Sequence, residues 1–377
     1  MRILFWQWNA FLEKGIEEAF RKMNMTYDVF PYVLQNWEKE DVFLEKLERQ
    51  IRENPYDVVF SVNYTPLISQ ICKDFSMYYI SWVYDSPVHI RNTEAMREAC
   101  NRIYFFDRGQ AQQYREAGIP AYHLPLAASS EAFAAASVRE KTAYGGQVAL
   151  VGQLYQTDYL KYAALLEEYQ RGYLEGLIRS QQQVYGGYFL GGLVTDELLE
   201  KLNARYREVS DGKIQIDQRQ LEFLLASEVT GRERYLALAL LSNRYKVSLY
   251  SKNRDERLKN VVQMGYVDYY TQMPQVFAKT QVNLNISLKT IQTGIPLRVL
   301  DVLACGGFLI SNYQAEMEEY FRLGEDLVVY ESLEDLVCKT DFYLGHESER
   351  LRIAENGKRR MEESFRFEDR IREMVPG

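Results

Sequence analysis

The chain has 377 residues, of which 47% are hydrophobic and 26% are charged, and its formal net charge at neutral pH is -8. These are the values of an ordered globular protein, and the length favours two domains because one hydrophobic core rarely grows so large. The excess of acids argues against a non-specific nucleic-acid binder, whose affinity comes largely from Lys and Arg neutralising phosphates.

Cysteine usage and hydropathy indicate a cytoplasmic protein. The four cysteines form no C-x-x-C pair, which is typical of reduced thiols in a cytosol. The N-terminal MRILFW leads directly into QWNAFLEKG without the pattern of a signal peptide. No run of 18 consecutive apolar residues occurs, so we expect no transmembrane segment.

In the first half of the chain, short apolar runs alternate with helical patterns. In EDVFLEKLERQIREN, Phe43, Leu47 and Ile51 recur at helical spacing. Such alternation predicts a parallel sheet covered by helices, and we assign 1–130 to a first domain and the small-residue stretch 131–146 to a linker. The runs that we expect to be strands are RILFW, YDVFPYVL, YDVVFSV, YYISWVY and RIYFFD.

The strand-like run QVALVGQLY opens a second domain, which we assign to 147–360. Residues 157–243 carry mostly helical patterns, such as KYAALLEEYQRGYLEGLIRSQQ and RERYLALALLSN, and predict a helical insertion. Alternation resumes with YKVSLYS, VVQMGYV, QVNLNIS, FLIS and LVVY, and we expect 361–377 to form a final helix that packs back on the first domain. The predicted fold is two doubly wound α/β domains with a cleft between their rows of strand ends, where ligands bind.

Several motifs of known chemistry are absent from the sequence. It has no G-x-G-x-x-G fingerprint, no P-loop and no G-x-S-x-G nucleophile elbow. No two aspartates are separated by one residue, and the three histidines have no metal-ligand spacing. We therefore expect chemistry without a metal site or a cofactor.

The stretch GIPLRVLDVLACGGFLISN, residues 294–312, predicts a loop, a short apolar helix and a strand. A helix N-terminus offers unpaired N–H groups to an anion, and Arg298 in the first turn adds a planar phosphate donor. Asp301 lies three residues on, on the same side of the helix, where it can accept hydrogen bonds from ribose or sugar hydroxyls. The alternative interpretation is structural, with Arg298 simply paired to a helix acid.

The C-terminal part resembles a known family of enzymes. From QVNLNISLKTIQTGIPLRVLDVLACGGFLISNYQAEMEEYF through ERLRIAENGKRRMEES, it is similar to CgeB-type, spore maturation protein-like glycosyltransferases, and SWVYDSP, RIYFFD and HLPLAA resemble their first domain. This resemblance implies the GT-B fold of two facing Rossmann-like domains, the first for the acceptor and the second for the nucleotide-sugar donor. Related enzymes carry a pair of acids on the helix. Asp301 matches the second acid, whereas Thr293 stands in place of the first.

The resemblance also implies a set of donor-binding residues. Gly152 and Tyr155 follow the first strand of the second domain, Lys252 ends a strand, and MGYVDYYTQ is similar to the loop that holds the nucleotide base. Each has a structural alternative as an ordinary strand end, a solvated lysine or a core tyrosine. The donor-binding candidates are Gly152, Tyr155, Lys252, Tyr266, Val267, Gly294, Ile295, Pro296, Leu297, Arg298 and Asp301.

The acceptor-side candidates are Asn9, Asp85 and His89. Asp85 stands at the end of the strand-like run YYISWVY, where an acid can act as a base or anchor a hydroxyl. The alternative for Asp85 is a turn residue bonded to its own backbone. Asp85 and Arg298 are the predicted catalytic residues.

The predicted function is metal-independent transfer of a hexosyl or N-acetylhexosaminyl group from a nucleotide-diphosphate sugar. The resemblance favours UDP, and the acceptor is a surface protein, a glycan or a metabolite. Arg298, Lys252 and helix N–H groups would stabilise the departing diphosphate. Two alternatives are a non-catalytic scaffold that binds a glycan or an enzyme, and a nucleotide-sugar epimerase.

Overall fold

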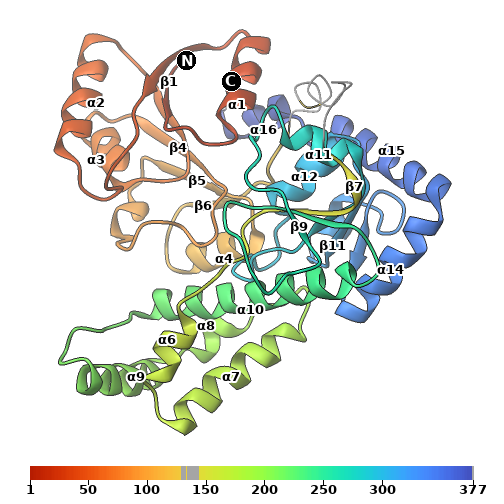
Figure 1. The fold of residues 1–377 in the computed structure, drawn as a ribbon. Helices are drawn as coiled ribbons and strands as arrows, with labels where there is room; N and C mark the ends of the chain where they lie inside the picture. Colours follow the sequence, from red (N-terminus) through yellow and green to blue (C-terminus); the bar gives the residue numbers. More distant parts are fainter. Residues whose placement is uncertain (129–132, 134–143, 376–377) are drawn as a thin grey trace. The chain divides into compact units, whose positions relative to one another are not determined.

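The computed structural model describes residues 1–128, 133 and 144–375. The chain divides into two compact units that are not continuous in sequence. Unit 1 comprises Met1–Ala132, Thr293–Ala304 and Arg359–Gly377, and unit 2 comprises Phe133–Gln292 and Cys305–Lys358. Each unit is built on one parallel sheet (Figure 1).

The described strands of unit 1 form a six-stranded parallel sheet in the order β2-β1-β3-β4-β5-β6. The two central strands, VVFSV and YYISWV, are almost wholly buried, as expected for parallel strands covered on both faces. The elements are β1 (Arg2–Gln7), α1 (Glu13–Lys22), β2 (Thr26–Pro31), α2 (Asp41–Glu53), β3 (Val58–Val62), α3 (Pro66–Asp74), β4 (Tyr78–Val83), η1 (Glu94–Arg97), β5 (Asn101–Phe105), α4 (Arg108–Glu116), β6 (Ala121–His123), α12 (Leu297–Ala304) and α16 (Phe367–Met374).

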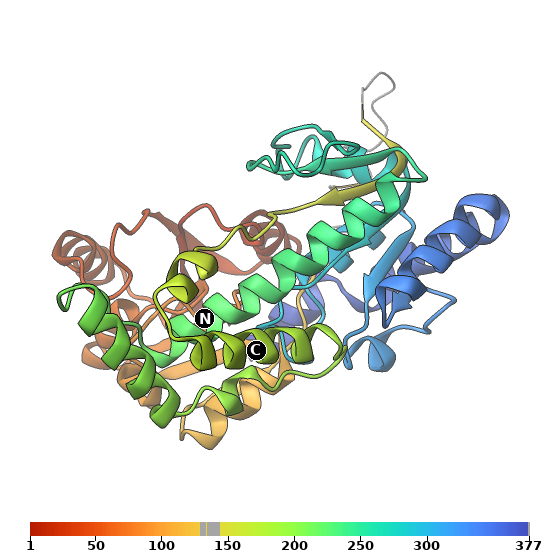
Figure 2. The ribbon, with the colours of Figure 1, turned by 60° about the horizontal axis from the view of Figure 1, so that its bottom comes forward.

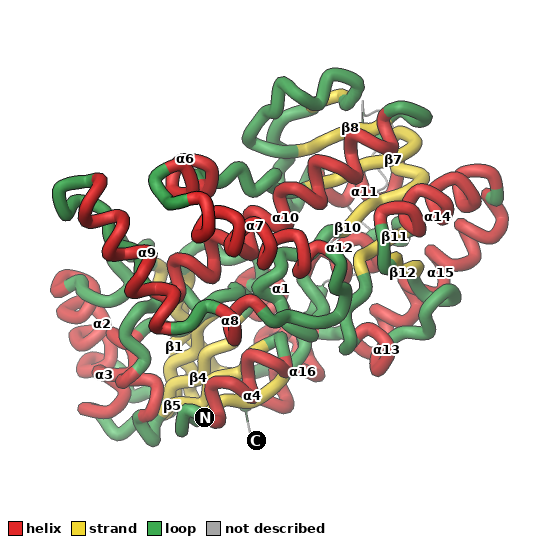
Figure 3. Tube along the Cα trace, turned by 90° about the horizontal axis from the view of Figure 1, so that it is seen from below, coloured by secondary structure: helices red, strands yellow, loops and turns green. Residues whose placement is uncertain are grey.

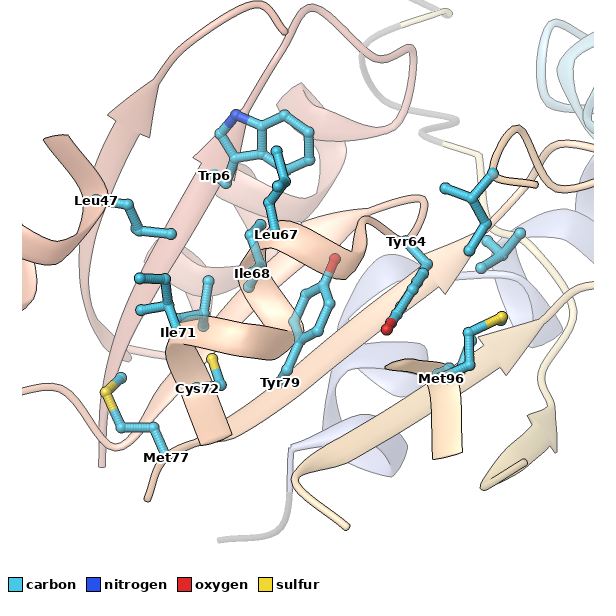
Figure 4. Packing of buried hydrophobic residues seen from close by; sticks show 14 of the residues in the cluster. Trp6, Leu47, Tyr64, Leu67, Ile68, Ile71, Cys72, Met77, Tyr79 and Met96 are labelled. Carbon is cyan, nitrogen blue, oxygen red and sulfur yellow. The ribbon is translucent and has the colours of Figure 1, made fainter. Parts of the chain in front are cut away.

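Apolar periodicity explains how the helices of unit 1 pack. Phe43, Leu47 and Ile51 of α2 are buried, which confirms the helical face predicted from their spacing. Helix α3 begins with Thr65 as its N-cap, whose hydroxyl accepts a hydrogen bond from Leu67 N at 3.2 Å, and with Pro66 in the first turn. Figure 4 shows how α3 packs toward Tyr79 in this core.

The described strands of unit 2 also form a six-stranded parallel sheet, in the order β12-β11-β10-β7-β8-β9. The predicted helical insertion is present between β7 and β8. The elements are β7 (Gly146–Val151), α6 (Tyr159–Ala164), α7 (Glu168–Gln182), α8 (Leu190–Leu193), α9 (Asp196–Val209), α10 (Gln218–Ser242), β8 (Val247–Tyr250), β9 (Val262–Gln263), α11 (Met273–Lys279), β10 (Thr280–Asn285), β11 (Leu309–Asn312), α13 (Met317–Tyr320), β12 (Val328–Tyr330), α14 (Leu333–Gly345) and α15 (Glu347–Ser364).

Helix α10 joins the insertion to the sheet. Its first half contributes Leu221 and Leu225 to the hydrophobic core of the insertion, and its second half contributes Leu238 and Leu241 to the core around the sheet. Figure 2 shows α10 as the long green helix, and Figure 3 shows α6, α7 and α8 along it. The insertion is therefore packed onto unit 2 through one continuous helix.

The units differ from the predicted domains at one internal segment. We expected 147–360 to form one domain, but residues 293–304 group with unit 1. Most of the predicted linker 131–146 lies outside the described residues, and its last residue, Gly146, begins β7. We keep 1–130, 147–360 and 361–377 as proposed domain boundaries. None of the helices in the described part of the chain is long and apolar enough to cross a membrane.

Candidate functional site

Three donor candidates lie at one edge of the unit 2 sheet. Gly152 and Tyr155 follow β7 and Lys252 follows β8, and the two strands are paired in parallel. These three residues therefore lie where α/β sheets bind ligands. Tyr155 adopts a left-handed backbone conformation with a φ of 51°, which is uncommon for a residue other than glycine.

Arg234, from α10, holds the loop after β7. Its Nε donates a hydrogen bond to the Ile286 carbonyl at 3.0 Å, and its Nη1 donates to the Gln153 carbonyl. Its guanidinium carbon lies 4.8 Å from the centroid of the Tyr155 ring, and a Cβ added to Gly152 would lie 3.1 Å from Nη1. A buried positive charge thus stands beside the loop that we expect to meet the donor diphosphate.

The neighbouring acid on α10, Glu233, belongs to a buried polar network. Its carboxylate lies 3.2 Å from the Lys289 ammonium and accepts a hydrogen bond from the Tyr330 hydroxyl at 2.9 Å. Lys289 also lies 4.5 Å from the centroid of the Tyr185 ring. Because Lys289 is buried and paired with Glu233, we assign it to the structure of unit 2 rather than to a ligand.

Lys252 is an exposed cation at this edge. Its ammonium lies 5.0 Å from the centroid of the Tyr266 ring, and it has no acidic partner among the described residues. The Tyr266 ring is itself exposed, so both side chains are accessible to a ligand. Val267 is buried, so this candidate can offer a ligand only its backbone.

The segment that begins at Thr293 packs on Asp107 in unit 1. Asp107 caps α4 by accepting a hydrogen bond from Gly109 N at 2.9 Å, and it also accepts one from Thr293 Oγ1 at 3.0 Å. A Cβ on Gly294 would lie 2.8 Å from the Asp107 Cα, closer than a side chain tolerates. Close packing on Asp107 therefore requires glycine at position 294, and the donor-binding role of Gly294 stays a prediction.

Arg298 and Asp301 of α12 form an ion pair. The Arg298 Nη1 donates a hydrogen bond to Asp301 Oδ2 at 3.2 Å, and the side chain of Asp301 is 1% exposed against 23% for Arg298. This contact is the structural alternative that the sequence left open. Asp301 orients Arg298, and Arg298 is the member of the pair that solvent reaches. Of the remaining candidates in this segment, Ile295 and Pro296 are buried and Leu297 is half-buried.

In unit 1, Asp85 and His89 form a hydrogen-bonded pair after β4. The His89 Nε2 lies 2.6 Å from Asp85 Oδ2, and Asn63 donates its side-chain amide to the same oxygen. The hydrogen bond to the Asp85 carboxylate raises the pKa of His89 above its ordinary value. Asp85 therefore orients an imidazole that is about half exposed, rather than serving only as a turn residue.

Beside this pair lies a cavity of about 360 Å³, lined by Trp8, Gln35, Asn36, Trp37, Glu38 and His89. The Trp8 and Trp37 ring centroids are 5.0 Å apart, and the Trp37 and His89 centroids are 5.6 Å apart. Asn9, the third acceptor-side candidate, is exposed next to Trp8 with a φ of 77°. Aromatic faces beside amides and a carboxylate suit a ligand rich in hydroxyl groups.

Comparisons with known proteins bear on this geometry. Residues 219–375 match a family described as glycosyl transferase-like. The solved structure of Anabaena Alr3699/HepE in complex with UDP and glucose is 10% identical, with a TM-score of 0.52, over 100% of this chain and 99% of that chain. Sucrose-phosphate synthase from Thermosynechococcus elongatus is 10% identical, with a TM-score of 0.58, over 99% and 97%. This chain has the GT-B fold.

A further structure with this GT-B fold is the glycosyltransferase from Rickettsia africae, at 10% identity and a TM-score of 0.57, over 99% of this chain and 96% of that chain. None of the curated protein sequences is significantly similar to this chain. At such low identity, the likeness to solved structures concerns the fold.

Within the GT-B fold, the predicted site residues fall into three groups. Gly152, Tyr155 and Lys252 lie at one sheet edge of unit 2, residues 294–301 group with unit 1, and Asp85 and His89 adjoin the cavity at Trp37. Arg234 and the two tryptophans, Trp8 and Trp37, were not among the residues predicted from the sequence. Arg234 lies in the segment RERYLALALL, whose helical pattern does not indicate that this arginine reaches the loop after β7.

Proposed function

We propose that this GT-B protein is a glycosyltransferase that uses a nucleoside-diphosphate sugar as its donor. The observation that carries the proposal is the match of 219–375 to a glycosyl transferase-like family, because that stretch contains Lys252, Tyr266, Arg298 and Asp301. Solved structures of Anabaena Alr3699/HepE with UDP and with UDP-glucose have the same fold, which makes UDP the first nucleotide to test. The finer proposal is a cytoplasmic, CgeB-type enzyme that transfers a hexosyl or N-acetylhexosaminyl group.

The donor side acts by stabilising negative charge. As the bond between the anomeric carbon and the diphosphate oxygen breaks, Lys252 and Arg298 would offset the charge on the departing diphosphate. Tyr266 would stack against the base, and the backbone at Val267 would hydrogen-bond to it. This arrangement assigns no role to a metal ion, so a chelator should leave binding unchanged.

The acceptor side would hold a protein, a glycan or a metabolite. An acceptor hydroxyl would form the new bond to the anomeric carbon and pass its proton to His89, which Asp85 orients. A base in this position is required if the anomeric configuration inverts. NMR analysis of the product's configuration tests this role, because retention would remove the need for His89 as a base.

A second candidate function is a non-catalytic scaffold on the same fold. Two observations favour it: Thr293 stands where related enzymes have an acid and is bonded to Asp107, and Arg298 is paired with Asp301. Both contacts can stabilise the fold when no ligand is bound.

A thermal-shift experiment separates the two functions. UDP, GDP, ADP, CMP and dTDP would each be tested with and without EDTA on the wild type, Arg298→Ala, Arg298→Lys and Lys252→Ala. A nucleotide at ~100 times its Kd stabilises the fold by about 2.7 kcal/mol, which a melting curve resolves. We expect one nucleotide to raise Tm in the wild type regardless of EDTA, and both alanine variants to lose that shift. Absence of a shift with every nucleotide would favour the scaffold.

The Arg298→Lys variant is the matched control. It keeps the positive charge but loses the planar, two-pronged donor, so it should retain part of the shift. Melting of the unliganded variants reports separately on the ion pair with Asp301. If Arg298→Ala lowers the unliganded Tm but keeps the full nucleotide shift, Arg298 is structural and the donor site does not include it.

A further inference from the structure

The helical insertion borders an open cavity of about 460 Å³ in unit 2. Its lining comes from the loop after β7, from α6, from the residues before α10, from α10 itself and from the loop after β8. It therefore lies at the carboxyl ends of β7 and β8, which are paired in parallel. Its lining includes Gln153, Tyr162, Gln215, Phe223, Ser227 and Asn253.

The lining is polar but almost uncharged. It contains no lysine or arginine, and its single acid, Asp158, is paired with Lys161 at 2.7 Å. Gln153, Gln215 and Asn253 are exposed, and their side-chain amides make no hydrogen bond to another described residue, so a ligand in the cavity can reach them. A wall of unused amides without a cation suits a neutral ligand with several hydroxyl groups, and it does not suit a phosphate.

One buried hydroxyl in this wall lacks a partner. Ser227 is 3% exposed, and its Oγ makes no hydrogen bond within the described residues. Buried polar groups are nearly always satisfied, so an orphaned hydroxyl at a cavity wall indicates a missing partner. A ligand hydroxyl can accept from Ser227 Oγ or donate to it.

Aromatic rings complete the cavity. Phe223, on α10, is 41% exposed, and Tyr162 is half-buried. The negative face of such a ring attracts the weakly positive C–H groups on the flat side of a sugar. Aromatic faces together with amide groups can thus hold both faces of a pyranose ring.

The cavity adjoins the cationic edge without including it. Asn253 lines the cavity, and its neighbour in sequence is the exposed cation Lys252. Tyr155 also lines the cavity and carries the guanidinium of Arg234 against its ring. The anionic part of a ligand could therefore lie beside Lys252 while a neutral part of the same ligand lies in the cavity.

We propose that this cavity, built by the helical insertion, is a saccharide subsite that binds one sugar ring. The assignment rests on the proposed function only for the source of the sugar, which is either the donor or a saccharide acceptor. The insertion would then set which sugar the protein accepts, because Gln215, Phe223 and Ser227 all belong to it.

Isothermal titration of the full chain tests the proposal with three kinds of ligand: UDP, the two donors UDP-glucose and UDP-N-acetylglucosamine, and the free disaccharides maltose and chitobiose. The variants are Phe223→Ala, Ser227→Ala and Gln215→Leu, and the control is Leu240→Ala, another exposed apolar residue of α10 that lies outside the cavity. Gln215 is an exposed loop residue, so Gln215→Leu keeps the test valid if the α10 variants fail to fold.

We expect Phe223→Ala to weaken sugar binding about tenfold and Leu240→Ala to leave it unchanged. If UDP binds the Phe223→Ala variant normally and only the binding of UDP-sugars is weakened, the sugar ring in the cavity belongs to the donor. If the binding of a free disaccharide is weakened, the sugar ring belongs to an acceptor. Weaker binding of UDP itself would overturn the proposal in favour of a nucleoside pocket. Equal binding by all variants, or no saccharide binding by the wild type, would also overturn it.

The titrations distinguish a failure of the saccharide subsite from a failure of the proposed transferase function. A wild type that binds a disaccharide through Phe223 but binds no nucleotide would remove the transferase function and keep the saccharide subsite. The opposite result is a wild type that binds UDP and a Phe223→Ala variant that binds every UDP-sugar as tightly as the wild type does. That result would keep the nucleotide site and remove the saccharide subsite.

Discussion

At the scale of single residues, partners far apart in sequence decide what a candidate does. Asp85 and His89 are four residues apart, and their position after a strand indicated a site. The sequence did not indicate that Asn63 would donate to the same carboxylate oxygen, or that Trp37 would lie beside the imidazole. These contacts depend on strands that are brought together only by the sheet. They turn two isolated candidates into one hydrogen-bonded group beside a cavity.

The pKa of His89 is the first residue-scale prediction. Its hydrogen bond to Asp85 raises the pKa above the ordinary value near 6.5, because the carboxylate stabilises the imidazolium. The pair therefore contributes stability that is fully present below that ordinary value and is lost as pH rises through the raised pKa of the folded state. NMR titration of the His89 ring should show the raised pKa in the wild type and a lower one in Asp85→Asn.

The charge-matched control for this titration is Asp74→Asn, which removes an exposed acid at the end of α3 in the same unit. It should leave the His89 titration curve in place. Equal curves in Asp85→Asn and the wild type would contradict the pairing of Asp85 with His89.

At the scale of elements, close packing explains why a glycine stands in the middle of a helix. Gly15 lies in α1 and is buried. A Cβ on Gly15 would lie 2.2 Å from the Phe367 ring of α16, and the two helices are in contact. The Phe367 ring, from the other end of the chain, therefore packs against Gly15 and leaves no room for a ligand there.

Substitution of Gly15 by alanine should therefore destabilise the protein. The new methyl group would collide with a buried ring, and overpacking of this kind costs about 1–3 kcal/mol. Urea unfolding followed by circular dichroism measures the change. The matched control is Gly172→Ala in α7, where an added Cβ meets no atom within 4 Å, and it should be neutral or stabilising by up to about 1 kcal/mol. Equal stability of the Gly15→Ala variant and the wild type would contradict the packing of Phe367 on α1.

At the scale of the whole molecule, each unit takes residues from distant parts of the chain. Helix α16 belongs to unit 1, where its Phe367 ring lies 6.1 Å from Trp82 and Arg370 donates a hydrogen bond to the Pro125 carbonyl at 3.0 Å. The preceding helix, α15, contributes Ile353 to the core of unit 2. The boundary between the units therefore falls within α15, whose residues up to Lys358 belong to unit 2 and whose last residues belong to unit 1 with α16.

Two core truncations test this division. Ile371 of α16 and Ile353 of α15 are both almost completely buried, so each isoleucine-to-alanine change should cost about 2–5 kcal/mol. Hydrogen exchange read by mass spectrometry should show lost protection in β1–β6 for Ile371→Ala and in β7–β12 for Ile353→Ala. The same pattern of lost protection in both variants would contradict the division into these units.

The sequence by itself determined the class of fold and much of its order. Alternating apolar runs and helical periodicity indicated parallel sheets, a helical insertion after the first strand of the second half, and the buried face of α2. These features are local, since they follow from side-chain spacing along a strand or a helix. The stretch around Arg298 and Asp301 was likewise recognisable, because its residues are close together in the chain.

The tertiary structure decided which of these residues meet. It paired Arg298 with Asp301, placed Thr293 and Gly294 on Asp107, brought Arg234 from the insertion to the loop after β7, and built a cavity from α10 and two strand ends. Apart from the local pair of Arg298 and Asp301, these contacts join residues tens to hundreds of positions apart, and no periodicity in a single sequence encodes them. Sheet pairing and helix packing bring these residues into contact, so the chemistry of the site depends on the fold.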